Sequence, residues 1–312
     1  MAPLTTVNGG SAVASSLPVD FAGLQLAHPI LNGSGTFDAV AALRTFGSDV
    51  RVRFPFSAFV SKTITLQPRA GNPPPRLWET PAGMINSIGL PNKGLKGFLE
   101  HDLPELASLG VPLVVSVAGF DHEEFGRLVQ GVAVRPEVAA VELNVSCPNV
   151  KSGCVVGSDM AEIDALLALL RPLTTKPLIV KLTPNVAAPE AIAAAAEASG
   201  ADAVSLINTL RGLALDPQTG KPWLGGEGGG VSGPAVRAVA LEMTYRVCSR
   251  VDIPVVGMGG IQSGQDALDF IDAGATCVAV GTENFRDPAA ANRIRKELGR
   301  LVEARGAAAR PH

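Results

Sequence analysis

A thiol and two carboxamides stand close together in the segment Asn144-Val145-Ser146-Cys147-Pro148-Asn149-Val150. An apolar run ends there, so we expect a strand to give way to a loop at this point. The unperturbed pKa of a cysteine thiol, about 8.5, lets a thiolate act as a general base at mildly alkaline pH. A cysteine taken alone is more often a packing residue. The neighbouring Asn and Pro residues favour proton chemistry at Cys147.

Two lysines follow apolar or β-branched residues, in Phe59-Val60-Ser61-Lys62-Thr63 and Ile179-Val180-Lys181-Leu182-Thr183. A single lysine in such a place could equally be an exposed strand end. Two ammonium groups near one pocket centre would stabilise negative charge, such as the charge that a reduced flavin carries near N1 and the C2 oxygen. The pair therefore favours a shared anionic ligand.

Polar residues end nearly every candidate strand of the chain. Burying such groups costs free energy unless a partner or ligand satisfies them, so the pattern predicts a polar ligand. Its members are Ser34, Lys62, Ser116, Asn144, Lys181 and Asn208. Gly259-Gly260 and Gly281-Thr282 end the last two strands and precede helices, where backbone N–H groups suit a phosphate. These glycines could serve only as tight turns, but their joint position favours a phosphate-bearing cofactor.

Short apolar runs alternate with longer amphipathic stretches about eight times, which predicts parallel strands that are each followed by a helix. We expect one (β/α)8 TIM barrel over residues 19–312, after a flexible tail over residues 1–18. Helices are expected after Ser158-Asp159 and after Ser263. The expected strands are Ile30 to Ser34, Ala58 to Thr63, Leu113 to Val117, Val141 to Val145, Leu178 to Leu182, Ala203 to Ile207, Pro254 to Gly257 and Cys277 to Gly281.

Two Pro/Gly-rich inserts interrupt this alternation, from Leu66 to Lys93 and from Leu210 to Pro234. Both follow strands, which in a barrel places them on the C-terminal face, where active sites are assembled. Long loops in compact domains are commonly functional. We therefore expect both inserts to serve the site.

Composition excludes several classes of protein. A net charge of −3 without a basic run gives no electrostatic footprint for nucleic acid. The four cysteines lack the spacing of a zinc or iron–sulfur site and suggest no disulfide framework, so a reducing cytoplasm is the expected location. The four histidines lack metal-ligand spacing, and we expect no metal, signal peptide or membrane segment. Cys154, Cys248 and Cys277 are interpreted as structural.

Together these motifs resemble the class 1 dihydroorotate dehydrogenase family, from about Leu24 to the end of the barrel near Pro288. The order of the motifs carries the likeness. They are Asn32-Gly33-Ser34-Gly35-Thr36, Ser61-Lys62-Thr63, Gly71-Asn72-Pro73, Asn86-Ser87-Ile88-Gly89-Leu90-Pro91-Asn92, Asn144 to Val150, Val180-Lys181-Leu182-Thr183-Pro184, Ile207-Asn208-Thr209 and Val231-Ser232-Gly233-Pro234.

The resemblance implies bound FMN and oxidation of dihydroorotate to orotate in pyrimidine (UMP) biosynthesis. In this chemistry Cys147 removes the C5 proton while a hydride passes from C6 to flavin N5, with Lys62 beside the reacting groups. The implied orotate site comprises Lys62, Asn86, Ile88, Gly89, Leu90, Asn144, Asn149, Asn208 and Thr209. The implied FMN site comprises Gly33, Ser34, Ser61, Lys62, Ser116, Asn144, Lys181, Ile207, Ser232, Gly233, Gly259, Gly260, Gly281 and Thr282.

Within the family, Cys147 and the polar tail argue against class 2, whose members use serine and a membrane-associating extension. Val256 to Ile261 and Leu206 to Gly212 are similar to class 1B. That class implies a partner subunit with FAD and a 2Fe-2S cluster, electron transfer to NAD, and a homodimer of barrels within a heterotetramer. Ser116, where class 1B relatives often carry Asn, and the Glu227 loop depart from the pattern.

Several alternatives stay open at this point. They are a class 1A-like enzyme that uses fumarate, a dihydropyrimidine dehydrogenase-like flavin barrel, a non-redox barrel that binds a phosphate ester, and a non-enzymatic assembly subunit. Asn149 after Cys147-Pro148 favours orotate over uracil or thymine as the ligand.

Overall fold

The computed structural model describes residues 17–146 and 156–308. Eight strands form one parallel sheet in the order β3-β14-β13-β10-β9-β8-β7-β4. Their bounds are β3 Ile30–Asn32, β4 Phe59–Val60, β7 Leu113–Val117, β8 Val138–Asn144, β9 Leu178–Lys181, β10 Ala203–Leu206, β13 Val255–Met258 and β14 Cys277–Val280. The expected (β/α)8 barrel and its eight strands are confirmed, with small differences at the strand ends.

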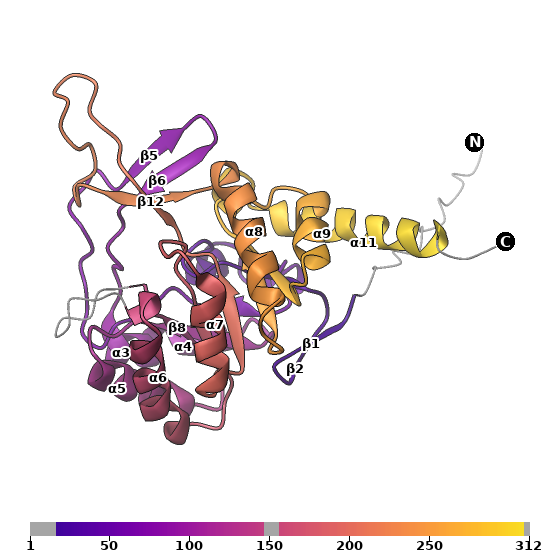
Figure 1. The fold of residues 1–312 in the computed structure, drawn as a ribbon, viewed down its shortest axis with the longest axis horizontal. Coiled ribbons are helices and arrows are strands. Elements are labelled where there is room, and N and C mark those ends of the chain that lie inside the picture. Colours follow the sequence, from indigo (N-terminus) through magenta and orange to yellow (C-terminus); the bar gives the residue numbers. More distant parts are fainter. Residues whose placement is uncertain (1–16, 147–155, 309–312) are drawn as a thin grey trace, which may run out of the picture.

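Helices cover the outside of this barrel (Figure 1). The longer ones are α1 Ala39–Phe46, α5 His122–Ala133, α6 Met160–Leu170, α7 Pro189–Ala198, α8 Arg237–Cys248, α9 Gly264–Asp272 and α11 Ala290–Ala308. Shorter turns are α2 Ser48–Val52, α3 Gly94–Gly97, η1 Phe98–Asp102, α4 Leu103–Ala107, η2 Val156–Ser158, η3 Arg171–Leu173, η4 Pro234–Val236 and α10 Glu283–Arg286. In the part of the chain described, no helix is both long and apolar enough to cross a bilayer.

Both expected helix starts are confirmed by their caps. The Asp159 carboxylate accepts hydrogen bonds from the Ala161 and Glu162 amides at the start of α6. Ser263 and Asp266 form a reciprocal capping box at the start of α9. Such caps satisfy backbone N–H groups that have no partner within the helix.

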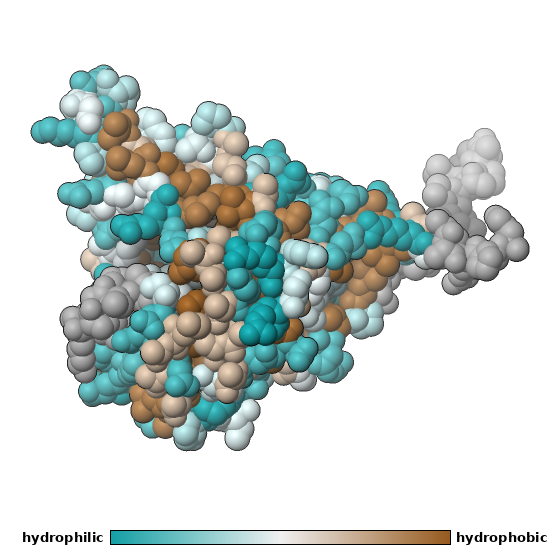
Figure 2. Space-filling model, in the orientation of Figure 1, coloured by the Kyte–Doolittle hydropathy of each residue, from teal (hydrophilic) through white to brown (hydrophobic). Residues whose placement is uncertain are grey.

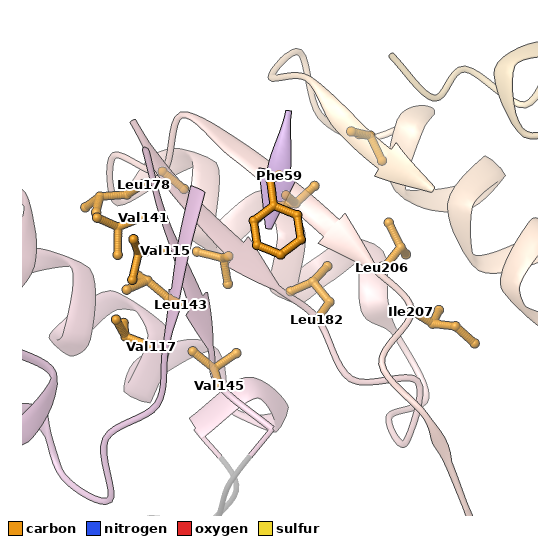
Figure 3. Close-up of a cluster of buried hydrophobic side chains, with 14 of the residues drawn as sticks. Phe59, Val115, Val117, Val141, Leu143, Val145, Leu178, Leu182, Leu206 and Ile207 are labelled. Atoms are coloured by element: carbon orange, nitrogen blue, oxygen red, sulfur yellow. The ribbon is translucent and has the colours of Figure 1, made fainter. Parts of the chain in front are cut away.

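Side chains alternate between two apolar layers along the barrel strands, because successive residues of a strand point to opposite faces. One layer lies between the strands and the helices. Figure 3 shows part of it, with Val115, Val141 and Leu178 gathered on neighbouring strands. The other layer, which includes Val114 and Ala140, fills the barrel interior.

A short antiparallel hairpin, β1 Val19–Phe21 and β2 Leu24–Leu26, packs against this inner layer. Phe21 and Leu26 belong to the same buried cluster as the interior strand residues. The hairpin therefore closes the barrel interior at the end where the strands begin, opposite the carboxyl ends of the strands. The sequence patterns did not predict it.

The two inserts form a second, antiparallel sheet that projects from the barrel (Figure 1), which we call the arm. Its strands are β5 Leu77–Thr80, β6 Gly83–Asn86, β11 Leu210–Gly212 and β12 Gly229–Ser232, in the order β11-β12-β6-β5. The expectation of two long loops was therefore incomplete. Gly229 allows the strands to approach, because a Cβ there would lie 2.5 Å from the Asn86 oxygen. Figure 2 shows apolar side chains along this arm, where Leu77, Leu213 and Leu215 are exposed.

Candidate active site

Hydroxyl and amide groups from the ends of three strands, β3, β7 and β8, converge on Thr63, which follows β4 at the mouth of the barrel, the end where the strands finish. The Thr63 Oγ1 lies 2.9 Å from the Ser116 Oγ and 3.1 Å from the Ser34 Oγ. The Asn144 amide donates to the same oxygen at 3.4 Å. The structure thus brings together Ser34, Ser116 and Asn144, which the sequence predicted as site residues. Thr63 was missed, although it belongs to the Ser61-Lys62-Thr63 triplet that carried part of the resemblance.

Ser61, also a predicted site residue, accepts hydrogen bonds from two members of this cluster. Its buried Oγ accepts a hydrogen bond from the Ser116 backbone N–H at 3.1 Å, and its carbonyl accepts one from the Ser34 hydroxyl at 2.8 Å. The ends of β3, β4 and β7 are therefore joined by side-chain hydrogen bonds, in addition to the backbone pairing of β4 with β7.

A second group of amides lies beside this cluster. The Asn208 amide donates to the Asn144 Oδ1 at 3.2 Å and to the Ser146 Oγ at 2.9 Å. Ser146 immediately precedes Cys147, and the Gly157 N–H donates to the Val145 carbonyl at 2.8 Å. Cys147 and Asn149 lie outside the described residues. The described ends of this segment are thus held at the barrel mouth.

The two predicted lysines lie in different surroundings. Lys181, at the end of β9, is buried, and its Nζ lies 3.9 Å from the carboxylate of Glu142. Lys62 reaches solvent at the mouth. Partial desolvation lowers the pKa of its ammonium; Asp38 opposes this effect and Arg76 reinforces it. Glu142 was missed by the sequence analysis, although a lone carboxylate in the apolar run Val138 to Leu143 was a visible signal.

Glycine-rich turns after the last strands surround a small hollow. Gly233, Gly260, Gly281 and Thr282 line it, together with Gln262 and Glu283. Gly260 has φ +73°, and a Cβ there would lie 2.8 Å from the Gly233 carbonyl oxygen. Only glycine lets the two turns approach so closely. Ser232 ends β12 just before this hollow, while Gly33 approaches Gly281 from β3, and Gly259 precedes Gly260 with φ +137°.

The predicted orotate residues of the arm join the mouth through β6 and β12. The Asn86 amide donates to the Gly230 carbonyl at 3.2 Å. Gly230 packs against Thr209, whose N–H donates to the Asn208 Oδ1 at 2.8 Å. Ile88, Gly89 and Leu90 follow β6, with φ +75° at Gly89 and +54° at Leu90, and Ile207 follows β10. The arm therefore borders the mouth of the barrel.

The two described cysteines lie away from this mouth. Cys248 ends α8 and Cys277 begins β14. Burial raises the pKa of Cys248 to about 11 and that of Cys277 to about 12. Their thiols are therefore held in the unreactive protonated form, which agrees with a structural role. Cys154 lies outside the described residues.

The arrangement is chemically suited to a flavin mononucleotide. Hydroxyl, amide and ammonium groups at the mouth offer partners for a polar ring system, and the glycine turns offer a narrow hollow for a phosphate. The described residues hold no group of three or more His, Cys, Asp or Glu side chains that could ligate a metal.

Comparison with known proteins supports a family assignment. The family model described as dihydroorotate dehydrogenase matches residues 16–302. The relative from Geotalea uraniireducens, dihydroorotate dehydrogenase B (NAD(+)), catalytic subunit, is 44% identical over 94% of this chain and 95% of its own. Proteins of the same name from Pelobacter propionicus and Geobacter sulfurreducens are each 45% identical, again over 94% of this chain and 95% of theirs. The chain belongs to the dihydroorotate dehydrogenase family.

Proposed function

We propose that this chain oxidises dihydroorotate to orotate with bound FMN, a step of pyrimidine (UMP) biosynthesis. The observation that carries the proposal is the convergence of Ser34, Thr63, Ser116 and Asn144 at one barrel mouth, beside a glycine-lined hollow. Family membership names the substrate that this arrangement serves.

FMN, when bound, supplies an acceptor for a hydride at its N5 atom. Gly233, Gly260, Gly281 and Thr282, which line the hollow, would hold its phosphate. Ser34, Asn144 and Lys181, at the mouth, would hold its ring system. The other residues predicted for this site lie near the ends of barrel strands, except Ser232, which ends β12 of the arm.

The substrate lies over this mouth, where Lys62 and the amides of Asn144 and Asn208 bind it. An ammonium and carboxamides complement a carboxylate and a ring amide. Cys147, the residue after Ser146, removes the C5 proton as general base. The hydrogen bond from Asn208 to Ser146 positions the start of that segment. Much of the catalysis then comes from holding base and substrate in one orientation.

The electrons pass to NAD through a separate subunit that carries FAD and a 2Fe-2S cluster. Support comes from the relatives, whose names include both NAD(+) and "catalytic subunit". We place the chain in the cytoplasm as a homodimer within a heterotetramer.

A visible spectrum of the purified protein tests the central proposal. We expect the absorbance of an oxidised flavin, which bleaches when dihydroorotate is added without oxygen. A colourless protein, or a flavin that dihydroorotate does not bleach, would contradict the proposal. The electron acceptor is then identified by reoxidising the reduced flavin with NAD or with fumarate. The NAD reaction is run with and without a co-purified iron–sulfur flavoprotein.

A further inference from the structure

Glu142 is a carboxylate inside the barrel, with 3% of its surface exposed. Period-two alternation along β8 places it two residues after Ala140, on the face that points into the barrel. The apolar residues Val114, Ile179 and Val256 line the same interior space. Burying an ionised carboxylate among such residues costs free energy unless its charge is offset and its oxygens accept hydrogen bonds.

Three polar side chains from neighbouring strands stabilise the buried carboxylate. The Ser116 hydroxyl donates to one Glu142 oxygen at 3.0 Å, and the Ser205 hydroxyl donates to the other at 3.0 Å. The Lys181 Nζ lies 3.9 Å from the oxygen that Ser116 also contacts. Ser116, Ser205 and Lys181 are all buried. Glu142 and Lys181 are the only buried charged side chains in the described barrel strands, so each is the other's counter-charge there.

The distance between the two charges shapes what Lys181 can do. At 3.9 Å the pair attract each other, but this separation is too long for a hydrogen bond. The three N–H groups of Lys181 are therefore not taken up by Glu142 and can donate elsewhere. In the strand register Lys181 lies beside Asn144, at the mouth of the barrel.

We propose that Glu142 is a positioning residue that holds Lys181 at the mouth and partly neutralises its charge, and so sets how strongly the bound flavin retains electrons. This inference rests on the proposed function. A flavin gains negative charge on two-electron reduction, and an ammonium nearby favours that state. A carboxylate behind the ammonium weakens this preference. Glu142 therefore keeps the flavin from holding its electrons too tightly to pass them on.

The test is the reduction potential of bound FMN, measured by equilibration with a reference dye. Glu142→Gln keeps the size of the side chain and removes its charge. We expect the equilibrium to shift about tenfold toward reduced flavin, which is about 30 mV for a two-electron couple. Lys181→Met should shift it in the opposite direction. Glu79→Gln, which removes an exposed carboxylate of the arm, is the matched control and should leave the potential unchanged.

A double-mutant cycle shows whether Glu142 acts through Lys181. Once Lys181 is replaced by Met, adding Glu142→Gln should change the equilibrium less than twofold, because no ammonium is left to neutralise. A shift as large as in the single variant would overturn the proposal, as would an unchanged or lowered potential in Glu142→Gln.

A third variant covers the case in which Glu142→Gln does not fold. Glu142→Asp keeps the carboxylate but moves it away from Lys181 by one methylene. We expect a shift of about threefold toward reduced flavin, and no shift would overturn the proposal. Failure of the proposed function is distinguishable from failure of this inference, because in that case even the wild-type protein would contain no flavin that dihydroorotate reduces.

Discussion

The side chain of Asn32 makes two hydrogen bonds to the backbone of Val60, across the junction between β3 and β4. Its amide donates to the Val60 carbonyl at 2.8 Å, and its Oδ1 accepts from the Val60 N–H at 2.8 Å. These strands are the two ends of the eight-stranded sheet. One backbone bond, from the Ser57 N–H to the Ile30 carbonyl at 3.1 Å, also spans the junction. Where the barrel closes, the Asn32 carboxamide thus makes the pair of hydrogen bonds that the backbone of a neighbouring strand would otherwise make.

Asn32→Ala should therefore destabilise the barrel. Asn32 is fully buried and Val60 nearly so, so the change leaves two backbone groups without partners. Each such group costs about 1–3 kcal/mol, and we expect the free energy of unfolding to fall by about 2–6 kcal/mol. Urea unfolding measures the change. Gln218→Ala, in an exposed turn, is the control, and its free energy of unfolding should stay within about 0.5 kcal/mol of wild type. An equally small change in Asn32→Ala would rule out a role for Asn32 in closing the barrel.

Stability should also depend on the protonation of His28. Burial, reinforced by Arg295, lowers the pKa of this imidazole from 6.5 to about 4. The unfolded chain then binds more protons between these values, so the free energy of unfolding rises with pH across that range. The contribution of neutral His28 is fully present above pH 6.5 and is lost as the pH falls toward 4, about 3 kcal/mol in all.

The matched variant for this prediction is His28→Asn. The Ile30 N–H donates to the His28 Nδ1 at 3.3 Å, and an asparagine oxygen can accept from the same amide without titrating. Urea unfolding of both proteins from pH 4 to pH 7 should show a flatter pH dependence in the variant. Parallel curves would exclude His28 as the titrating group.

Cys248 and Cys277 should resist alkylation in the folded protein. The raised pKa values of Cys248 and Cys277 keep these thiols protonated at pH 8, and the thiolate is the reactive form. We expect iodoacetamide to leave both unmodified in the native protein and to modify both after unfolding, as measured by peptide mass spectrometry. Rapid native labelling of Cys277 would contradict its burial in β14.

Cys147→Ala should separate cofactor binding from proton abstraction. We expect the variant to bind FMN and yet to bleach with dihydroorotate orders of magnitude more slowly, because the general base is missing. Stopped-flow absorbance without oxygen measures this rate. Cys248→Ala, which removes a thiol far along the chain in α8, serves as the control and should bleach at nearly the wild-type rate. Near-normal bleaching of Cys147→Ala would refute the base assignment.

Lys62→Ala should weaken orotate binding by about tenfold to a hundredfold, the usual cost of losing a hydrogen bond to a charged group. The lowered pKa of Lys62 adds a pH effect in the wild type. Orotate affinity should be fully present at neutral pH and decline as the pH rises through that pKa, earlier than for an ordinary lysine. Flavin absorbance titrations measure the affinity. Lys96→Ala, on an exposed helix face, should bind orotate as wild type does, and an unchanged Lys62→Ala would remove this residue from the site.

Local patterns in the sequence were enough to determine the eight strands, the capped starts of α6 and α9 and the polar strand ends. Hydrophobic periodicity and capping act over a few neighbouring residues, and parallel strands that alternate with helices leave few possible architectures. Asn144, Lys181 and Gly260 could therefore be placed at one end of a barrel before their contacts were known.

Only the tertiary structure decided which distant residues meet. The arm pairs Asn86 with Gly230, although these residues belong to inserts that each look like a loop. Asn32 is a barrel-closing residue only because the closed sheet brings it to Val60. Glu142 is an isolated carboxylate in an apolar run until the pairing of β8 with β9 brings the Lys181 Nζ to 3.9 Å from it. These contacts depend on the closure and register of the whole sheet, which no short stretch of sequence specifies.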